Sequence, residues 1–153
     1  MLYLVQHGDA VPKQQDADRP LSAQGMADVT RIAEFLQKAG ISVDRVLHSG
    51  KTRAKQSAEI LALAISESGV IETLPGIDPN DAVVDIAEQI TQFITPTVIV
   101  GHLPFMAKLV SFLLLGKDDV ELVAYQPGSI VCLDNNQESR WTINWMIRPE
   151  LVN

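Results

Sequence analysis

Three histidines in this chain could carry acid–base or nucleophilic chemistry, and each of them follows a short apolar run. They are His7 after residues 2–6, His48 after residues 46–47, and His102 after residues 98–101. Runs of this length that are rich in valine, isoleucine and leucine are typical of buried strands. Because ligands of an open α/β sheet bind at the carboxyl ends of its strands, we expect the three imidazoles to converge on one rim.

A group of basic residues could hold an anion on the same rim. Residues 49–57 place polar and basic side chains at the start of an expected helix, where free N–H groups and the helix dipole favour negative charge. Arg53 could add a two-pronged guanidinium clamp there. Arg19, in the loop after the first expected strand, could be a second phosphate contact. The alternative is an exposed surface charge, which we favour for Lys51 and Lys55.

Glycines stand beside two of the histidines. Gly8 follows His7, and Gly101 precedes His102. A glycine lets a ligand approach the main chain closely, and free N–H groups of such a turn could donate to an anion. A half-buried packing role is the alternative for each histidine taken alone. The repeated construction favours a functional site over two independent packing residues.

Composition and charge narrow the class of protein. The 153 residues suit one domain over residues 1–153, and the net charge of −7 argues against nucleic acid or an anionic membrane as the main partner. No apolar stretch reaches the ~20 residues that a spanning helix needs. Residues 1–5 are too short for a signal-peptide core, so we expect a cytoplasmic protein. The single cysteine, Cys132, is expected to be a buried structural thiol.

Strand and helix patterns alternate through most of the chain. We expect strands at residues 2–6, 44–48, 70–73, 97–100, 129–133 and 140–146, and helices starting near residue 22, after residue 48, near residue 83 and near residue 104. The first helix should bury Met26, Val29, Ile32, Ala33 and Leu36, and the third should extend to Phe93 and Ile94. In the last strand Trp141, Ile143 and Trp145 should alternate with Thr142, Asn144 and Met146. This order predicts a three-layer α/β/α fold with a mainly parallel central sheet and an antiparallel C-terminal strand pair.

Taken together, four motifs resemble the histidine phosphatase superfamily, and within it the small phosphohistidine phosphatases of the SixA type. The matching segments are residues 4–10, 19–25, 46–57 and 100–104. Each motif is weak alone, but their order and spacing also fit and span most of the chain. The chain has the size of that small subfamily, without the insertions of phosphoglycerate mutases or acid phosphatases.

The resemblance implies a specific site and reaction. His7 matches the family nucleophile, which takes the phosphoryl group as a covalent phosphohistidine, and Arg53 and His102 match residues that hold phosphoryl oxygens. Arg19 matches a loop arginine that contacts phosphate. The remaining phosphate-binding candidates are Gln6, Gly8, His48 and Ser49. The reaction is then a metal-free, cofactor-free transfer from substrate to His7 and on to water. The implied substrate is a phosphorylated protein carrying phosphohistidine or a small phosphomonoester.

One position departs from the family pattern. The motif is Arg-His-Gly, and Gln6 stands in place of the arginine. A charged hydrogen bond is worth roughly 1.5–3 kcal/mol, so ~10-fold or more in rate is at stake. A protonated His48 could partly compensate. A catalytically weakened phosphate or phosphoprotein binder is therefore the second hypothesis.

Two further questions stay open in the sequence. The three histidines could form a metal site, although the arginines on the same rim disfavour a cation. A general acid could come from Asp9, Asp78 or Asp81. We expect no dedicated acid, because the imidazole of phosphohistidine is a good leaving group.

Overall fold

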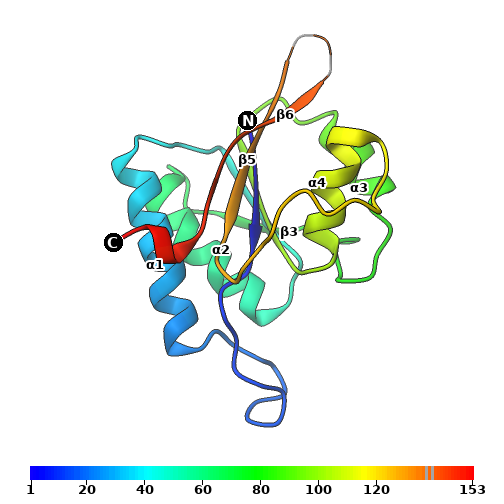
Figure 1. Ribbon diagram of the computed structural model, residues 1–153. Helices are drawn as coiled ribbons and strands as arrows, with labels where there is room; N and C mark the ends of the chain where they lie inside the picture. Colours follow the sequence, from blue (N-terminus) through cyan, green and yellow to red (C-terminus); the bar gives the residue numbers. More distant parts are fainter. Residues whose placement is uncertain (137, 139) are drawn as a thin grey trace.

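The computed structural model describes residues 1–136, 138 and 140–153. Within these residues, six strands form one sheet in the order β3-β2-β4-β1-β5-β6 (Figure 1). The strands are β1 (Leu2–Gln6), β2 (Arg45–His48), β3 (Ile71–Thr73), β4 (Thr97–Gly101), β5 (Ile130–Asn135) and β6 (Trp141–Ile147). β1 to β4 pair in parallel, and β5 is antiparallel to both β1 and β6. The expected mainly parallel sheet with an antiparallel C-terminal pair is confirmed.

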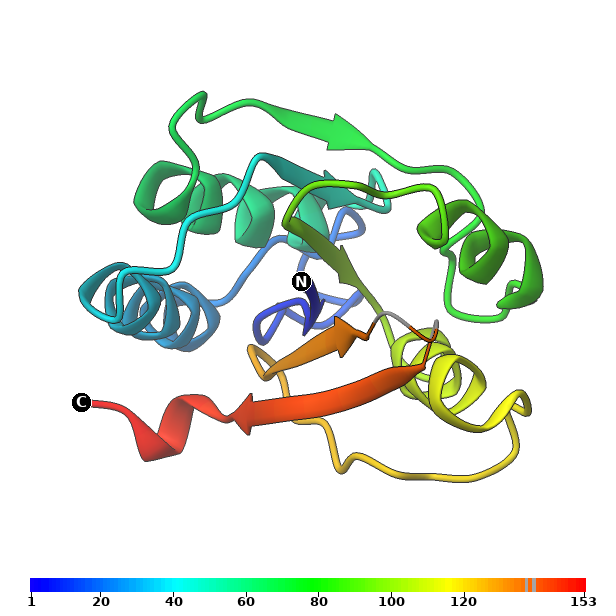
Figure 2. The ribbon, with the colours of Figure 1, turned by 90° about the horizontal axis from the view of Figure 1, so that it is seen from above.

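Helices cover both faces of this sheet, as expected for three layers (Figure 2). α1 (Ala23–Lys38) and α2 (Thr52–Ile65) lie on one face, and α3 (Val84–Ile90) and α4 (Phe105–Leu115) lie on the other. A short helix, η1 (Pro149–Leu151), contacts α1. Successive residues of β1 pack against opposite helix layers. Leu2 and Leu4 pack on the α3–α4 side, whereas Tyr3 and Val5 pack on the α1–α2 side. The strand is therefore buried on both faces.

The start of α1 is built to lie very close to the loop that follows β1. Ser22 caps the helix by accepting a hydrogen bond from the N–H of Gly25 at 3.0 Å. A Cβ atom on Gly25 would lie 2.0 Å from the carbonyl oxygen of Asp9, and one on Gly8 would lie 2.8 Å from the carbonyl oxygen of Gly25. The two glycines let one backbone pack directly on another. Met26, expected in the core, is instead 51% exposed because Gly25 faces the loop in its place.

Substituting Gly25 by alanine should therefore destabilise the fold. Alanine gains about 1 kcal/mol of helix propensity, but the close contact with a rigid carbonyl should cost more, leaving a net loss of roughly 2 kcal/mol in the free energy of unfolding. Denaturant unfolding measures it. Ala27→Gly at an exposed site of α1 is the matched control and should cost only the ~1 kcal/mol of propensity. A Gly25→Ala protein as stable as the parent would contradict the close contact.

Two expectations, one about the end of α3 and one about the side chains of β6, are wrong. α3 ends at Ile90, and Ile94 is 96% exposed. After Ile90 the N–H groups of Thr91, Gln92 and Phe93 bond to carbonyl oxygens three residues back, so the chain leaves α-helical geometry before Pro96 and β4. In β6, Trp141 and Trp145 pack on opposite faces of the sheet. The register shifts between Cys132 and Leu133, so β6 contains one extra residue opposite this point. The alternation of β6 side chains between the two faces of the sheet reverses there.

Cys132 is buried as expected, and burial raises the pKa of its thiol to about 11. The thiol therefore stays protonated at neutral pH, which suits a structural residue. In the part of the chain that the structure describes, no helix combines the length and the apolar character needed to cross a membrane.

Candidate active site

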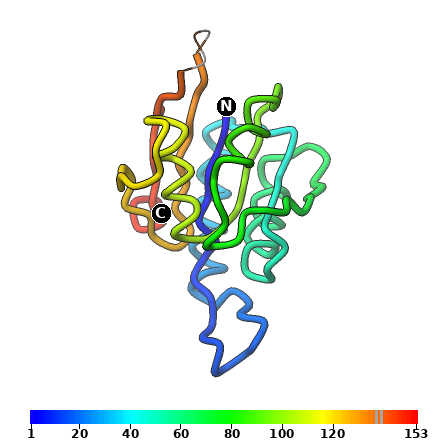
Figure 3. The backbone as a smooth tube through the Cα atoms, turned by 90° about the vertical axis from the view of Figure 1, so that its right-hand side faces the viewer, coloured from blue at the N-terminus to red at the C-terminus, as the bar shows by residue number. Residues whose placement is uncertain are grey.

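A pocket of about 360 Å³ lies at the carboxyl edge of the sheet, where β1 and β4 end. The loop of residues 8–20 extends beyond this edge and forms part of its wall (Figure 3). The lining residues are Gln6, His7, Asp9, Ala10, Arg19, Arg53, Pro79, His102, Leu103 and Pro127. Gln6 pairs with Gly101 across the parallel strands, so the histidines that follow them are neighbours, with ring centroids 4.9 Å apart. Five of the candidate site residues thus share one pocket.

The His7 ring is held in one orientation by hydrogen bonds at both nitrogens. Nδ1 lies 2.6 Å from the carbonyl oxygen of Gly8, and the Nε–H of Arg53 donates to Nε2 at 3.2 Å. Because a carbonyl oxygen only accepts, Nδ1 carries the ring proton and Nε2 carries the lone pair. Burial, followed by the charges of Arg53 and Arg19, lowers the pKa of His7 to about 4, while the Gly8 hydrogen bond opposes this. At neutral pH the ring is an uncharged base with Nε2 as its nucleophilic atom.

His102 is fixed in a similar way from the other side. Its Nε2 lies 2.6 Å from Oγ of Ser49, and that oxygen accepts the N–H of Lys51 at 3.3 Å. A Ser49 hydroxyl that donates to Nε2 leaves the ring proton on Nδ1, and Nδ1 is buried without a partner. Burial, followed by the charge of His7, lowers the pKa of His102 to about 3. Ser49 thus contacts His102 instead of lining the pocket, and Nδ1 of His102, which is shielded from solvent, is left as a donor without a partner.

These pKa shifts predict the behaviour of both rings in an NMR titration. Signals of His7 and His102 should stay at neutral-ring positions from about pH 7.5 to about pH 5.5, since both pKa values lie well below 6.5. The unfolded chain takes up these protons first, so stability should fall as the pH drops from about 6.5 towards about 4. His7→Ala and His102→Ala assign the two signals. A titration midpoint near pH 6.5 for either ring would contradict the lowering of its pKa by burial.

Two arginines supply positive charge to the pocket. Arg53 lies in the first turn of α2, and Arg19 donates from Nε to the carbonyl oxygen of Val11 at 3.2 Å. Burial, followed by the charge of Arg19, lowers the pKa of Arg53. Among the described residues neither guanidinium forms an ion pair. Arg19 also adopts a φ of 47°, a costly conformation for a residue with a Cβ atom. Two guanidinium groups against the single carboxylate of Asp9 leave the pocket with a net positive charge, which favours an anionic ligand.

Contrary to expectation, the N–H groups of His7 and Gly8 in the turn after β1 are not free. The N–H of His7 donates to the carbonyl oxygen of Gly101 at 3.0 Å, and the N–H of Gly8 donates to Oγ of Ser57 at 3.0 Å. Ser57 in turn donates to the carbonyl oxygen of Arg53 at 2.8 Å. Gly8 therefore allows the close approach of its backbone to Gly25 of α1, and its carbonyl oxygen is the acceptor for Nδ1 of His7. Ser57 ties the histidine turn to α2, a role that its place in the matched motif could have suggested.

His48 does not reach the pocket. It is 4% exposed, its Nδ1 accepts the N–H of Gly50 at 3.0 Å, and its charged neighbours are Lys55 and Glu59 of α2. Burial, followed by the charge of Lys55, lowers its pKa. The structure gives no support to a protonated His48 that replaces the missing arginine charge. We therefore leave it out of the proposed site.

Gln6 and the candidate acids occupy distinct places. Gln6 lines the pocket, and its Oε1 is buried without a hydrogen-bond partner. Asp9 also lines the pocket, but its carboxylate accepts the hydroxyl of Ser22 at 2.6 Å. Asp78 pairs with Lys51 at 3.5 Å, and Asp81 accepts the N–H of Asp78. Neither of these two aspartates lines the pocket.

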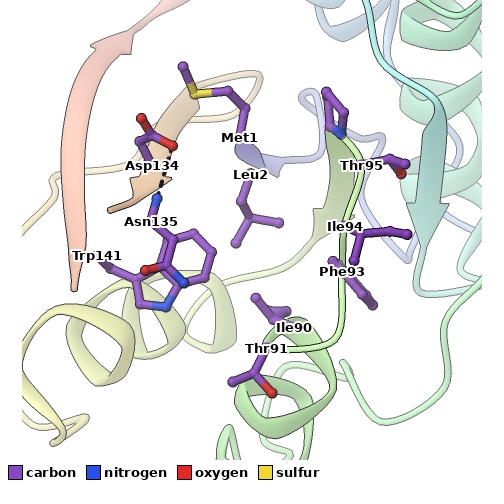
Figure 4. Close-up of a pocket in the computed structure, with 11 residues that line it drawn as sticks. Met1, Leu2, Ile90, Thr91, Phe93, Ile94, Thr95, Asp134, Asn135 and Trp141 are labelled. Atoms are coloured by element: carbon purple, nitrogen blue, oxygen red, sulfur yellow. Dashed lines mark hydrogen bonds between the residues drawn. The ribbon is translucent and has the colours of Figure 1, made fainter. Parts of the chain in front are cut away.

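The rest of the pocket wall is apolar, and sequence reasoning missed it. Ala10, Pro79, Leu103 and Pro127 come from four separate loops, and none of them has chemistry that would single it out. Across residues 1–136, 138 and 140–153, no group of three or more histidine, cysteine or acidic side chains is placed to hold a metal ion. A second pocket, at the opposite edge of the sheet beside Trp141 and Phe93, has no histidine or arginine among its described lining residues (Figure 4).

Fold and pocket together define a three-layer α/β protein with a cationic site around two histidines at the carboxyl edge of its sheet. Residues 2–78 match the family model of the histidine phosphatase superfamily, branch 1. The chain therefore belongs to this superfamily, and the membership supports phosphatase, that is hydrolase, chemistry.

The relatives agree with this assignment. The chain is similar to the phosphohistidine phosphatase SixA of Escherichia coli K12, with 24% identity over 97% of this chain and 93% of that protein. The solved structure of the protein histidine phosphatase SixA complexed with tungstate superimposes with a TM-score of 0.85, at 23% identity over 98% and 97% of the two chains. A SixA-type protein from Agrobacterium tumefaciens gives a TM-score of 0.78, at 21% identity over 97% and 96%.

Proposed function

We propose that this chain is a protein phosphohistidine phosphatase that works through a covalent phosphohistidine on His7. The observation that carries the proposal is the Nε2 lone pair of His7, fixed by the Gly8 carbonyl behind the ring and facing Arg53 in a cationic pocket. The Escherichia coli relative bears the name phosphohistidine phosphatase, and the solved SixA holds an oxyanion, tungstate. Both facts support the proposal.

The first step transfers the phosphoryl group to the enzyme. Arg53 and Arg19 receive the phosphoryl oxygens, and the Nδ1–H of His102 adds a third donor once its ring turns toward the ligand. The Nε–H of Arg53 passes from Nε2 of His7 to a phosphoryl oxygen, and the freed Nε2 attacks phosphorus in line with the leaving nitrogen. The new bond joins phosphorus to Nε2, and the bond to the substrate imidazole breaks. A substrate ring that is protonated on its other nitrogen leaves as neutral imidazole, so Asp9, Asp78 and Asp81 need not supply a proton. The positive His7 ring that results keeps its Nδ1–H on the Gly8 carbonyl.

The second step restores the enzyme. Water attacks phosphorus from the side that the leaving group vacated, the bond to Nε2 breaks, and inorganic phosphate departs with the two protons of that water. His7 regains its neutral form with the proton on Nδ1, which is the state that its lowered pKa favours. The guanidinium groups supply the positive charge in both steps, so the proposal requires no metal ion.

The second candidate is a phosphoprotein binder with little turnover, and Gln6 is the observation that favours it. The neutral amide supplies no charge where the family motif has arginine, and its Oε1 is buried without a hydrogen-bond donor. An assay with a phosphohistidine peptide and an aryl phosphate, each with and without chelator, separates the two candidates. Chelator-insensitive turnover that His7→Ala abolishes supports the phosphatase. Binding of the peptide without turnover supports the binder.

Restoring the arginine should speed the reaction. Gln6→Arg should raise kcat/KM by ~10-fold or more, because a charged hydrogen bond to the transferring group is worth roughly 1.5–3 kcal/mol. Gln6→Met, which keeps the length of the side chain without a donor, is the matched control and should lower the rate. An unchanged kcat/KM in a folded Gln6→Arg protein would show that position 6 does not contact the phosphoryl group.

A further inference from the structure

A second groove adjoins the proposed active site. Its volume is about 350 Å³, and it lies between the start of α4 and the segment that follows this helix. Leu103 and Ala107 contribute apolar surface, and residues 118–121 form the opposite side. Leu103, which is 37% exposed, lines this groove and also lines the pocket that contains His7. A bound chain that leaves the His7 pocket across Leu103 would therefore enter the groove.

The two hollows carry opposite charge. The His7 pocket holds two guanidinium groups and the single carboxylate of Asp9, whereas the groove brings together the carboxylates of Asp118, Asp119 and Glu121 with a single ammonium group, Lys108. Within the described part of the chain none of these four side chains takes part in an ion pair. The groove is thus an apolar hollow with a net negative rim. A chain with a phosphoryl group at one end and a basic side chain beside an apolar one would complement both hollows.

We infer that this groove is a docking subsite for the protein substrate, and that it selects a phosphohistidine flanked by an apolar and a basic residue. The inference rests on the proposed function and names its substrate class. The apolar flank packs on Leu103 and Ala107, and the basic flank meets the carboxylates of residues 118–121. A small phosphomonoester fills only the His7 pocket and should not be affected by the groove.

Peptides with one phosphohistidine and either Leu-Lys or Leu-Glu flanks test the inference. The triple variant Asp118→Asn, Asp119→Asn and Glu121→Gln should raise KM for the basic peptide by ~3–10-fold, since exposed charge pairs are worth roughly 0.2–1 kcal/mol each. Its kcat, and its rate with an aryl phosphate, should be unchanged. Lys108→Glu should lower KM for the basic peptide. The control variant removes three exposed carboxylates elsewhere, through Glu34→Gln, Glu67→Gln and Glu88→Gln, and should have no effect.

Several outcomes overturn the inference. Equal KM values for basic and acidic peptides in the parent protein, or equal effects of the triple variant and its control, would remove the subsite. Failure of the proposed function is distinguishable, because affinity for a non-hydrolysable phosphohistidine analogue with each flank is measured without turnover. A flank preference in binding with no hydrolysis would keep the subsite and reject the phosphatase. Hydrolysis with no flank preference would keep the phosphatase and reject the subsite.

Discussion

His7→Ala is expected to lower turnover of a phosphohistidine peptide by at least ~1,000-fold, because it removes the atom that accepts the phosphoryl group. The residual rate would reflect water attack within a pocket that still holds Arg53, Arg19 and His102. The assay is release of inorganic phosphate under saturating substrate, with the unfolding midpoint measured on the same sample. The unfolding midpoint shows whether a loss of activity is caused by a loss of stability.

His48→Ala is the informative companion. Its ring lies outside the pocket, so turnover of the folded protein should stay within about twofold of the parent rate even where its stability falls. Strong loss of turnover in a folded His48→Ala protein would return this residue to the site. A His7→Ala protein with nearly the parent rate would show that the nucleophile lies elsewhere.

The second large effect is expected at Arg53. Arg53→Ala removes a charged donor to the transferring group together with the Nε–H contact to His7, and should lower kcat/KM by ~100- to 1,000-fold. Arg53→Lys keeps the charge but loses the planar fork, so it should recover only about 10-fold of that loss. Steady-state kinetics with an aryl phosphate measure both variants.

Arg45→Ala is the matched control for a lost surface arginine. Arg45 pairs with Glu72 at 3.5 Å and stacks over Phe93, away from the pocket. Its removal should leave kcat/KM unchanged. If the Arg45 and Arg53 variants lose activity equally, general charge and not the geometry of the pocket controls the rate.

The convergence of His7 and His102 could be predicted because both follow buried strands and turn at a glycine. Parallel strands end at the same edge, and the Gln6–Gly101 pairing then sets the rings side by side. His48 shows the limit of this argument. It is the last residue of β2 and pairs with Val100, whereas His7 and His102 each lie one residue beyond the end of their strands. His48 therefore stops one residue short of the sheet edge, and its ring lies beside Lys55 and Glu59 of α2 instead of entering the pocket.

Other features depend on contacts that a single sequence does not contain. The packing of Gly8 on Gly25 joins a loop and a helix through their backbones, and no side-chain pattern marks it. The extra residue in β6 separates Trp141 from Trp145 because β5 and β6 pair with a shifted register. The apolar wall of Pro79, Leu103 and Pro127 is assembled by the fold from separate loops. Hydrophobic periods of two and 3.6 residues predict strands and helices one at a time, whereas these features arise from contacts between separate elements.

Trapping the phosphorylated protein tests the central claim most directly. The protein is mixed with a phosphohistidine peptide for less than one turnover, quenched in alkali, digested and examined by mass spectrometry. The account predicts one added phosphoryl group on His7, stable in alkali and lost in acid, that disappears as inorganic phosphate is released. Phosphate release at the full rate with no phosphorylated His7, or with the phosphoryl group on another residue, would contradict it.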